Sequence, residues 1–336
     1  MPPSAPVPVL PRLRVLATGG TIAGAQTGGS RGYQAAAFSI EALIGAVPQL
    51  ATLAQLEVEQ VAAIGSQDMN EAVWLKLAAR TQAALAEPDI AGVVITHGTD
   101  TMEETGYFLN LVVHSAKPVV LVGAMRPATE ISADGPMNLY NAVAVAVHPD
   151  TRGRGVLVVA NDEIHFAREV SKTNTTQVGT FKATHRGLAG LVHAGRLHLY
   201  APPVRRHTTA SEFAVAPATV LPRVDIVYAY AGMGRELIDA AVRAGAKGLV
   251  IAGVGDGNLN TAALAATAAA ARAGVAVVRS SRTGGGVVER NLEISDDELG
   301  FIAADELNPQ KARVLLMLGL TRTADPAALQ ELFLTY

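Results

Sequence analysis

The sequence predicts an α/β protein, with a larger N-terminal domain on a doubly wound, mainly parallel sheet and a smaller C-terminal α/β domain. Short runs of Val, Ile, Leu and Ala alternate with segments of helical periodicity, and turns rich in Gly, Ser, Thr or Asn join them. The 336 residues are 49% hydrophobic and only 17% charged, which fits a core-rich chain of about two domains. We place these domains at 1–205 and 223–336, separated by a Pro-containing linker without clear periodicity at 206–222.

The first domain shows a repeated strand–turn–helix pattern. The runs that predict strands are 13–17, 58–64, 93–96, 118–122 and 155–160, and those that predict helices are 39–46, 71–85, 102–114 and 137–147. Asn70 is a plausible N-cap for the second of these helices, and Pro48 ends the first. Ala194-Gly195 lies at the centre of a loosely alternating run, which predicts a hairpin over 190–200.

The second domain repeats the pattern on a smaller scale. The strands are expected at 225–230, 248–254 and 275–279, and the helices at 236–244 and 261–273. Two closing helices should begin after Asn308 and Asp325, because each residue is a good N-cap followed directly by Pro.

Composition excludes several classes of site. With no Cys there is no disulfide, thiolate nucleophile or Cys-ligated zinc, and the 8 His residues show no metal-ligand spacing, so we expect no metal. The glycines near Gly19 do not form a dinucleotide-binding pattern, because Thr21 stands where a Gly is needed, and we expect no cofactor. The net charge of −3 gives no reason to expect a nucleic acid or membrane partner.

The first twenty residues lack the charged and then apolar regions of a signal peptide. We therefore expect a cytoplasmic protein, or a periplasmic or secreted one if the sequence is a mature form. The Ala-rich run 259–278 is too weakly hydrophobic for a membrane span and contains Arg272.

Polar residues gather where the predicted strands of the first domain end, which is where α/β sheets bind ligands. The residues in question are Thr21, Ser66, Gln67, Thr99, Asp100 and, from the polar loop 169–177, Lys172. Taken singly, each has a simpler interpretation as a turn residue, a helix cap or a solvated surface group.

Together these residue types suit attack on a carbonyl group. A Thr hydroxyl needs a base to become a nucleophile, and a Lys kept neutral by desolvation can serve, with a neighbouring Asp to orient it. Thr99, Lys172 and Asp100 would then form a triad with the logic of Ser-His-Asp. These residues alone do not indicate which group would leave the carbonyl carbon.

Two long motifs extend the argument: ATGGTIAG at 17–24 and THGTDTMEET at 96–105. They resemble the two signatures of the bacterial type II L-asparaginase and glutaminase-asparaginase family. The likeness runs from about residue 13 to residue 336 and includes GSQDMN, GAMRP, SADGPMNLYNA, SKTNTT, RSSR and LNPQKARVLL.

The resemblance implies that Thr21 is the primary nucleophile, with Tyr33 nearby on a glycine-rich lid loop at 26–34. It implies that Thr99, Lys172 and Asp100 form the second triad. This lid is one residue shorter than in some relatives.

The resemblance also implies a set of substrate contacts. Asp100 would bind the substrate's α-ammonium group and Ser66 its α-carboxylate, with Gln67 alongside. Main-chain groups around Thr99 and Ala124 would stabilise the oxyanion.

The family's site is completed by the C-terminal domain of a neighbouring subunit within a homotetramer made of two intimate dimers. Asn258 and Glu293 match the positions that complete it. Asp256 is a departure, since many relatives carry Asn there, and it adds a carboxylate close to this shared site.

The implied function is hydrolysis of L-asparagine to L-aspartate and ammonia. Substantial glutamine hydrolysis is the alternative, because one methylene changes discrimination by only about 1–3 kcal/mol. An amidase subunit of a tRNA-dependent amidotransferase is disfavoured, because no basic or RNA-contacting domain is appended. A non-catalytic amino-acid-binding protein is disfavoured by the intact set Thr21, Thr99, Asp100 and Lys172.

Overall fold

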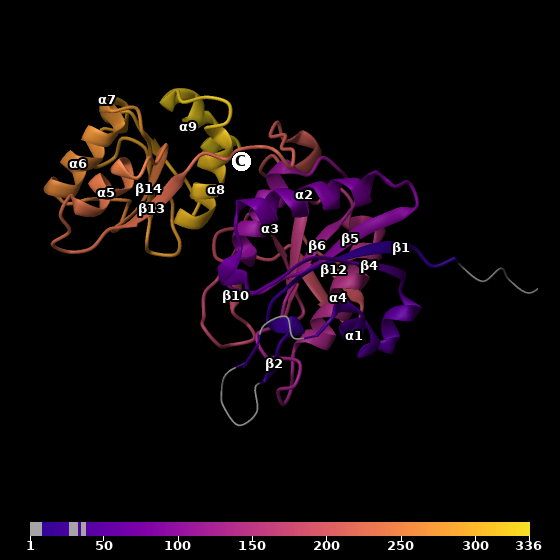
Figure 1. Cartoon of the computed structure of the whole chain (residues 1–336). Helices are drawn as coiled ribbons and strands as arrows, with labels where there is room; N and C mark the ends of the chain where they lie inside the picture. Colours follow the sequence, from indigo (N-terminus) through magenta and orange to yellow (C-terminus); the bar gives the residue numbers. More distant parts are fainter. Residues whose placement is uncertain (1–8, 27–32, 35–37) are drawn as a thin grey trace, which may run out of the picture. The chain divides into compact units, whose positions relative to one another are not determined.

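The computed structural model describes residues 9–26, 33–34 and 38–336 and has the predicted α/β architecture (Figure 1). The chain forms two compact units. The first comprises 1–183, 187–203 and 208–217, and the second comprises 184–186, 204–207 and 218–336.

The first unit contains an eight-stranded sheet in the order β12-β11-β8-β7-β6-β5-β1-β4. Its strands are β1 (Arg12–Gly19), β4 (Gln55–Ile64), β5 (Ile90–Thr96), β6 (Val119–Val122), β7 (Val156–Ala160), β8 (Glu163–Phe166), β11 (Gly190–His193) and β12 (Arg196–Leu199). The five strands from β7 to β4 run parallel, and the other three are antiparallel. β5, β6 and β7 are almost entirely buried, as expected of parallel strands covered on both faces.

Helices cover both faces of this sheet (Figure 1). They are α1 (Ile40–Gly45), α2 (Glu71–Ala86), α3 (Met102–Val112) and α4 (Gly135–Val147). On the α2 and α3 side, Trp74 stacks on Phe108 with ring centroids 5.1 Å apart. On the α1 and α4 side, a buried cluster includes Val94, Val120 and Leu139. The predicted cap is confirmed, because the Asn70 side chain accepts a hydrogen bond from Val73 N at 3.1 Å.

The predicted hairpin is also confirmed, with Ala194 and Gly195 at φ of 47° and 78° between β11 and β12. A second hairpin joins β7 to β8 through Asn161 and Asp162, which also have positive φ. It was not expected, although an Asn-Asp pair is a signal for such a turn.

Several of the predicted site residues lie in short elements. The 3₁₀ turns are η1 (Thr21–Ala23), η2 (Pro48–Thr52), η3 (Ser66–Asp68), η4 (Pro149–Thr151) and η5 (Thr208–Ala210), and the two-stranded pairs are β2 (Ala25–Gln26) with β3 (Tyr33–Gln34) and β9 (Val170–Lys172) with β10 (Phe181–Ala183). The expectation of a loop over 169–177 is wrong at its start, because Lys172 ends strand β9. Its pairing partner there is Phe181.

The second unit is a four-stranded parallel sheet in the order β13-β14-β15-β16. Its elements are β13 (Val224–Tyr228), α5 (Glu236–Arg243), β14 (Gly248–Gly253), α6 (Thr261–Arg272), β15 (Ala276–Ser281), α7 (Asp296–Leu299), β16 (Phe301–Ala303), α8 (Pro309–Gly319) and α9 (Pro326–Thr335). α5 and α6 cover one face, and α8 and α9 the other (Figure 1). Asn308 and Asp325 cap the last two helices as predicted. Within the described residues, no helix is long and apolar enough to cross a membrane.

Candidate active site

The predicted site residues of the first unit follow the carboxyl ends of neighbouring parallel strands. Thr21 follows β1, Ser66 follows β4, Thr99 and Asp100 follow β5, and Ala124 follows β6. Since the carboxyl ends of parallel strands share one edge of the sheet, these turns lie together, at the edge where α/β proteins bind ligands.

Two glycines allow the turn that carries Thr21 to approach the turn that carries Thr99. Gly20 has a φ of 84°, and a Cβ atom at this position would lie 2.3 Å from the backbone nitrogen of Gly98. A Cβ atom at Gly98 would lie 2.6 Å from the Ser66 hydroxyl oxygen. A side chain at either position would therefore force the turns apart.

The second predicted triad is assembled in the structure. The Lys172 ammonium donates to Thr99 Oγ1 at 2.9 Å and to Asp100 Oδ1 at 2.5 Å. The 2.9 Å distance to Thr99 lies in the range over which a base and its partner exchange a proton, and the shorter contact with Asp100 is an ion pair. Thr99 is only 5% exposed, whereas the Asp100 side chain is 55% exposed. The carboxylate is therefore accessible to a ligand while it holds the amine.

Thr21 lies beside this triad in the same cavity, whose volume is about 300 Å³. The cavity is lined by Thr21, Thr99, Asp100, Met125, Arg126, Pro127, Glu130, Lys172, Thr175 and Thr176. Four of the predicted catalytic residues thus meet in one cavity large enough for a small amino acid.

Ser66 and Gln67 stand next to this cavity rather than in its described lining. The Ser66 hydroxyl is buried and accepts a hydrogen bond from the Asp100 N–H at 3.1 Å, while Ser66 O accepts one from the Thr101 hydroxyl at 2.8 Å. Gln67 is exposed on the same turn. Ser66 therefore fixes the backbone that carries Asp100.

The loop that contains Ala124 is held by an acidic side chain that the sequence analysis did not single out. Asp134 accepts hydrogen bonds from the two backbone N–H groups that follow Ala124, at 3.0 and 2.9 Å. Asn138 donates to the Gly123 carbonyl at 3.0 Å. These bonds fix the main chain around Ala124, as an oxyanion-binding loop requires.

Glu103 is a second residue that sequence reasoning missed. Its place in the first turn of α3 suggests only a favourable helix-dipole charge. In the structure it is 5% exposed, and its carboxylate accepts the backbone N–H of Lys172 at 2.6 Å. It therefore anchors the strand end from which the Lys172 side chain reaches the triad.

Replacing this anchor should reduce catalysis without removing a reacting group. We expect Glu103→Ala to lower kcat by about 10–100-fold, because the backbone of Lys172 would no longer be held in place. Effects of this size are typical of residues that orient a functional group without reacting themselves. Glu104→Ala, on the same helical turn, is the matched control and should change kcat by less than about threefold. Steady-state ammonia release measures both, and equal activity of the two variants would remove the positioning role of Glu103.

His97 gives the site a pH-dependent element of stability. It is fully buried, its Nδ1–H donates to the Gly98 carbonyl at 2.6 Å, and burial lowers the pKa of its imidazole from 6.5 to about 4. Between these two values the unfolded chain binds the proton and the folded chain does not. Stability from neutral His97 is therefore complete above pH 6.5 and is lost as the pH falls towards 4.

We expect this histidine to contribute roughly 3 kcal/mol to the loss of unfolding free energy between pH 7 and pH 4. The variant His97→Asn, compared with the parent by denaturant unfolding at several pH values, should show a shallower decline. An unchanged slope would contradict a neutral, buried His97.

Three further predicted residues, Asn258, Glu293 and Tyr33, are not among the described residues that line this cavity. In the second unit, Asn258 Nδ2 donates to Glu293 Oε2 at 2.6 Å, so these two predicted partners are brought together. Tyr33 belongs to strand β3, but its side chain lies outside the described part of the structure.

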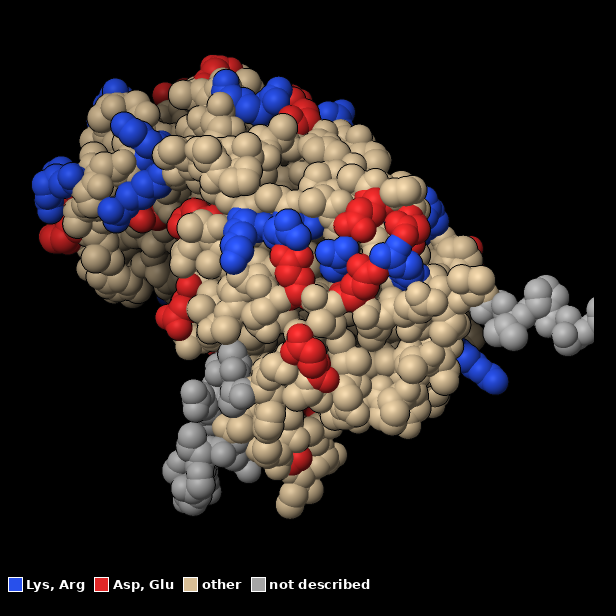
Figure 2. All heavy atoms as spheres, turned by 45° about the vertical axis from the view of Figure 1, so that its right-hand side comes forward, with Lys and Arg blue, Asp and Glu red and all other residues tan. Residues whose placement is uncertain are grey.

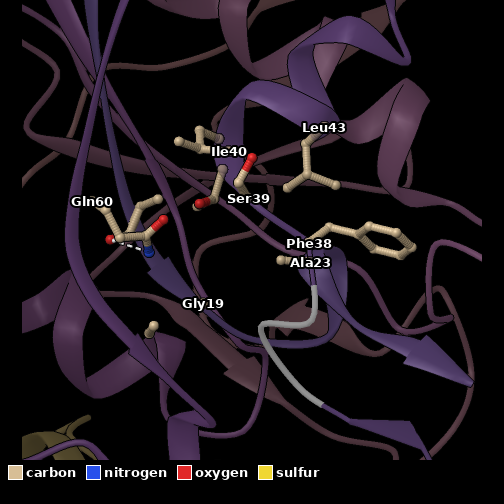
Figure 3. Close-up of a pocket in the computed structure, with 10 residues that line it drawn as sticks. Gly19, Ala23, Phe38, Ser39, Ile40, Leu43 and Gln60 are labelled. Atoms are coloured by element: carbon tan, nitrogen blue, oxygen red, sulfur yellow. Dashed lines mark hydrogen bonds between the residues drawn. The ribbon is translucent and has the colours of Figure 1, made fainter. Parts of the chain in front are cut away.

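A second hollow, of about 250 Å³, is lined in part by Ala17 and Gly19 of β1 and Ala23 of η1. Figure 3 shows Phe38, Ile40 and Leu43 on one side of it and Gly19 and Gln60 on the other. Its described lining holds no titratable side chain, so it offers no acid, base or charged anchor for catalysis.

Basic and acidic side chains are interspersed on the face drawn in Figure 2, which therefore shows no continuous basic patch. Arg14 forms ion pairs with both Glu57 and Glu87. Among the described residues, no group of three or more His, Asp or Glu is arranged to hold a metal ion.

Known protein families and solved structures resemble this chain over most of its length. Two family models match: "Asparaginase, N-terminal" over residues 12–205 and "Glutaminase/Asparaginase C-terminal domain" over residues 223–333. "Probable L-asparaginase periplasmic" of Haemophilus influenzae is 51% identical, with 96% of this chain and 93% of that protein aligned. "L-asparaginase 2" of Escherichia coli is 50% identical, with 97% of this chain and 94% of that protein aligned. The crystal structure of "Probable Cytoplasmic L-asparaginase" from Campylobacter jejuni matches with a TM-score of 0.91 and 47% identity, over 97% of this chain and 100% of that one.

Proposed function

This chain belongs to the asparaginase family, and we propose that it hydrolyses the side-chain amide of L-asparagine to L-aspartate and ammonia with Thr21 as the nucleophile. The observation that carries the proposal is the single cavity in which Thr21 meets the Thr99–Lys172–Asp100 triad.

In the first half of the reaction, Thr21 Oγ1 attacks the carbonyl carbon of the side-chain amide. The hydroxyl proton passes to a base, and the main chain around Thr99 and Ala124 stabilises the oxyanion. The C–N bond then breaks, and the nitrogen takes up a proton and leaves as ammonia. An ester of L-aspartate on Thr21 remains.

In the second half, water attacks this ester and gives its proton to a base. We assign the Thr99–Lys172 pair to proton transfer at this centre, because its 2.9 Å contact lies in the same cavity as Thr21. The C–O bond to Thr21 breaks, the hydroxyl is restored, and L-aspartate leaves.

The charged ends of the substrate fit the polar groups around the cavity. Asp100, largely exposed, is placed to bind the α-ammonium group. Ser66 would bind the α-carboxylate with Gln67 alongside, which requires the substrate to extend from the lined cavity towards the η3 turn. Such two-point binding would align the amide with Thr21.

Ammonia release from L-asparagine and L-glutamine tests the function. We expect a measurable kcat/KM for L-asparagine and a lower one for L-glutamine, and a ratio near unity would favour the glutaminase-asparaginase alternative. Release from neither amide would favour a binding protein and overturn the proposal.

We also propose that the chain is a homotetramer made of two intimate dimers, in which Asn258 and Glu293 complete the site of a neighbouring subunit. Their mutual hydrogen bond of 2.6 Å supports their acting as one unit. Sedimentation under assay conditions should give the tetramer mass, and a fully active monomer would contradict the shared site.

For the compartment, we propose the cytoplasm. Fractionation of cells that express the protein from its native gene should recover it with cytosolic markers. Recovery in the periplasm or the medium would contradict this location.

A further inference from the structure

Arg279 is the largest fully buried side chain among the described residues. It lies on β15, an inner strand of the second unit's sheet, where it pairs in register with Ile251 and Ala303. Its partner Asp296 is also fully buried, and the two side chains form a bidentate ion pair with distances of 2.6 and 2.7 Å.

The guanidinium group also ties together two loops. Nη1 donates to the Asp256 carbonyl at 2.8 Å, and Nη2 donates to the Glu289 carbonyl at 2.9 Å. A direct link reinforces the connection, because Asp256 Oδ1 accepts the Glu289 N–H at 2.9 Å. Asp296 extends it further by accepting the Asn291 N–H at 2.8 Å.

These two loops carry Asn258 and Glu293. The first loop closes on itself, since Val254 and Asn258 exchange two backbone hydrogen bonds of 3.0 and 2.8 Å around the residues between them. The second loop passes from Glu289 to Glu293 at the surface. An exposed carboxylate held to an amide by one hydrogen bond would otherwise sample many rotamers, so the buried network below limits where the pair can lie.

Energetics favour a positioning role over a purely stabilising one. Burying an ion pair costs desolvation energy, and well-packed apolar residues of similar volume often stabilise a protein as well or better. Arg279 and Asp296 instead satisfy backbone groups of both loops, which apolar side chains could not do.

We propose that Arg279 and Asp296 are positioning residues for substrate binding, which act by holding Asn258 and Glu293 in one fixed geometry. The inference rests on the proposed function, in which this pair completes a substrate site. It assigns the two buried residues an effect on KM that is exerted through Glu293 and not through the chemistry at Thr21.

A double-mutant cycle on the full-length protein tests the inference. We expect Arg279→Lys and Glu293→Ala each to raise KM for L-asparagine by about tenfold and to change kcat by less than about threefold. Because Arg279 acts through Glu293, the double variant should show the KM of Glu293→Ala alone. Independent, multiplying effects would overturn the inference, as would an Arg279→Lys variant that loses kcat or thermal stability with KM unchanged.

A milder pair of variants serves if Arg279→Lys does not fold. Asp256→Ala removes only the side-chain acceptor of the Glu289 N–H, at a partly exposed position, and should raise KM by about threefold. Asp256→Asn keeps an oxygen there and should restore the parent KM. An unchanged KM in Asp256→Ala, or no rescue by Asp256→Asn, would contradict the network.

Failure of the inference can be told apart from failure of the proposed function. If Glu293→Ala leaves KM unchanged while Thr21→Ala is inactive, Glu293 does not contact the substrate and the positioning role of Arg279 and Asp296 is wrong. The proposed hydrolytic function is then still supported. If Glu293→Ala raises KM but Arg279→Lys does not, only the positioning role is wrong. Absence of ammonia release by the parent protein would overturn the function itself.

Discussion

Thr21→Ala should lower kcat for L-asparagine by about 10⁴-fold or more and leave the fold intact. Loss of the attacking oxygen removes the covalent step, and nucleophile deletions in other acyl-transfer enzymes have effects of this size or larger. The side chain is 8% exposed and faces the cavity, so its removal takes little from the core. Ammonia release at saturating substrate measures the loss.

Thr21→Ser is the matched control, because it keeps a hydroxyl at the same position. We expect it to retain far more activity than Thr21→Ala, with both variants unfolding within a few degrees of the parent. If Thr21→Ala keeps more than about a tenth of the parental kcat, Thr21 is not the nucleophile.

Lys172→Met should lower kcat by about 10²–10⁴-fold, which is the range for loss of a general base. Methionine preserves most of the side chain's length but cannot exchange a proton with Thr99 or hold Asp100. The ion pair that it breaks is partly exposed, so we expect stability to change much less than activity.

Two further lysine variants separate proton transfer from charge. Lys172→Arg keeps a positive charge beside Asp100 but cannot act as a base, because guanidinium does not lose its proton in proteins. It should be nearly as inactive as Lys172→Met. Lys182→Met, on the neighbouring strand β10 with its side chain 48% exposed, should be fully active. Full activity of Lys172→Arg would show that the charge alone matters.

The parts of the fold that the sequence predicts are those with strong local signals. Continuous apolar runs predict β5, β6 and β7. Asn70, Asn308 and Asp325 predict the starts of three helices, and the structure contains the side-chain cap at each one. In each case the deciding interaction spans only a few residues, so the local sequence is sufficient.

The parts that could not be predicted depend on contacts between distant segments. β9 is three residues long, and its polar composition resembles a loop until it pairs with β10. Glu103 anchors Lys172 across 69 residues, so nothing near Glu103 marks it as different from Glu104. The motifs predict Thr21, Thr99, Asp100 and Lys172 as site residues, but they do not predict which side chains hold the backbone of the site in place, such as Glu103 and Asp134.

The second unit also contains a contact that the local sequence does not predict. Arg279 stands out in the sequence only as the first residue of RSSR, and its buried ion pair with Asp296 joins β15 to the first residue of α7, 17 positions later. A charged residue in a strand would ordinarily suggest exposure. Its hydrogen bonds to two loop carbonyls explain why it is buried.

The central claim is that Thr21 forms an ester with the acyl group of the substrate. The most direct test is turnover in the presence of hydroxylamine, which competes with water for an acyl-enzyme. L-asparagine and L-aspartate β-methyl ester should give the same ratio of β-hydroxamate to L-aspartate, because both pass through one ester, and Thr21→Ala should form neither product. Ammonia release without hydroxamate at any hydroxylamine concentration, or ratios that differ between the two substrates, would contradict the account.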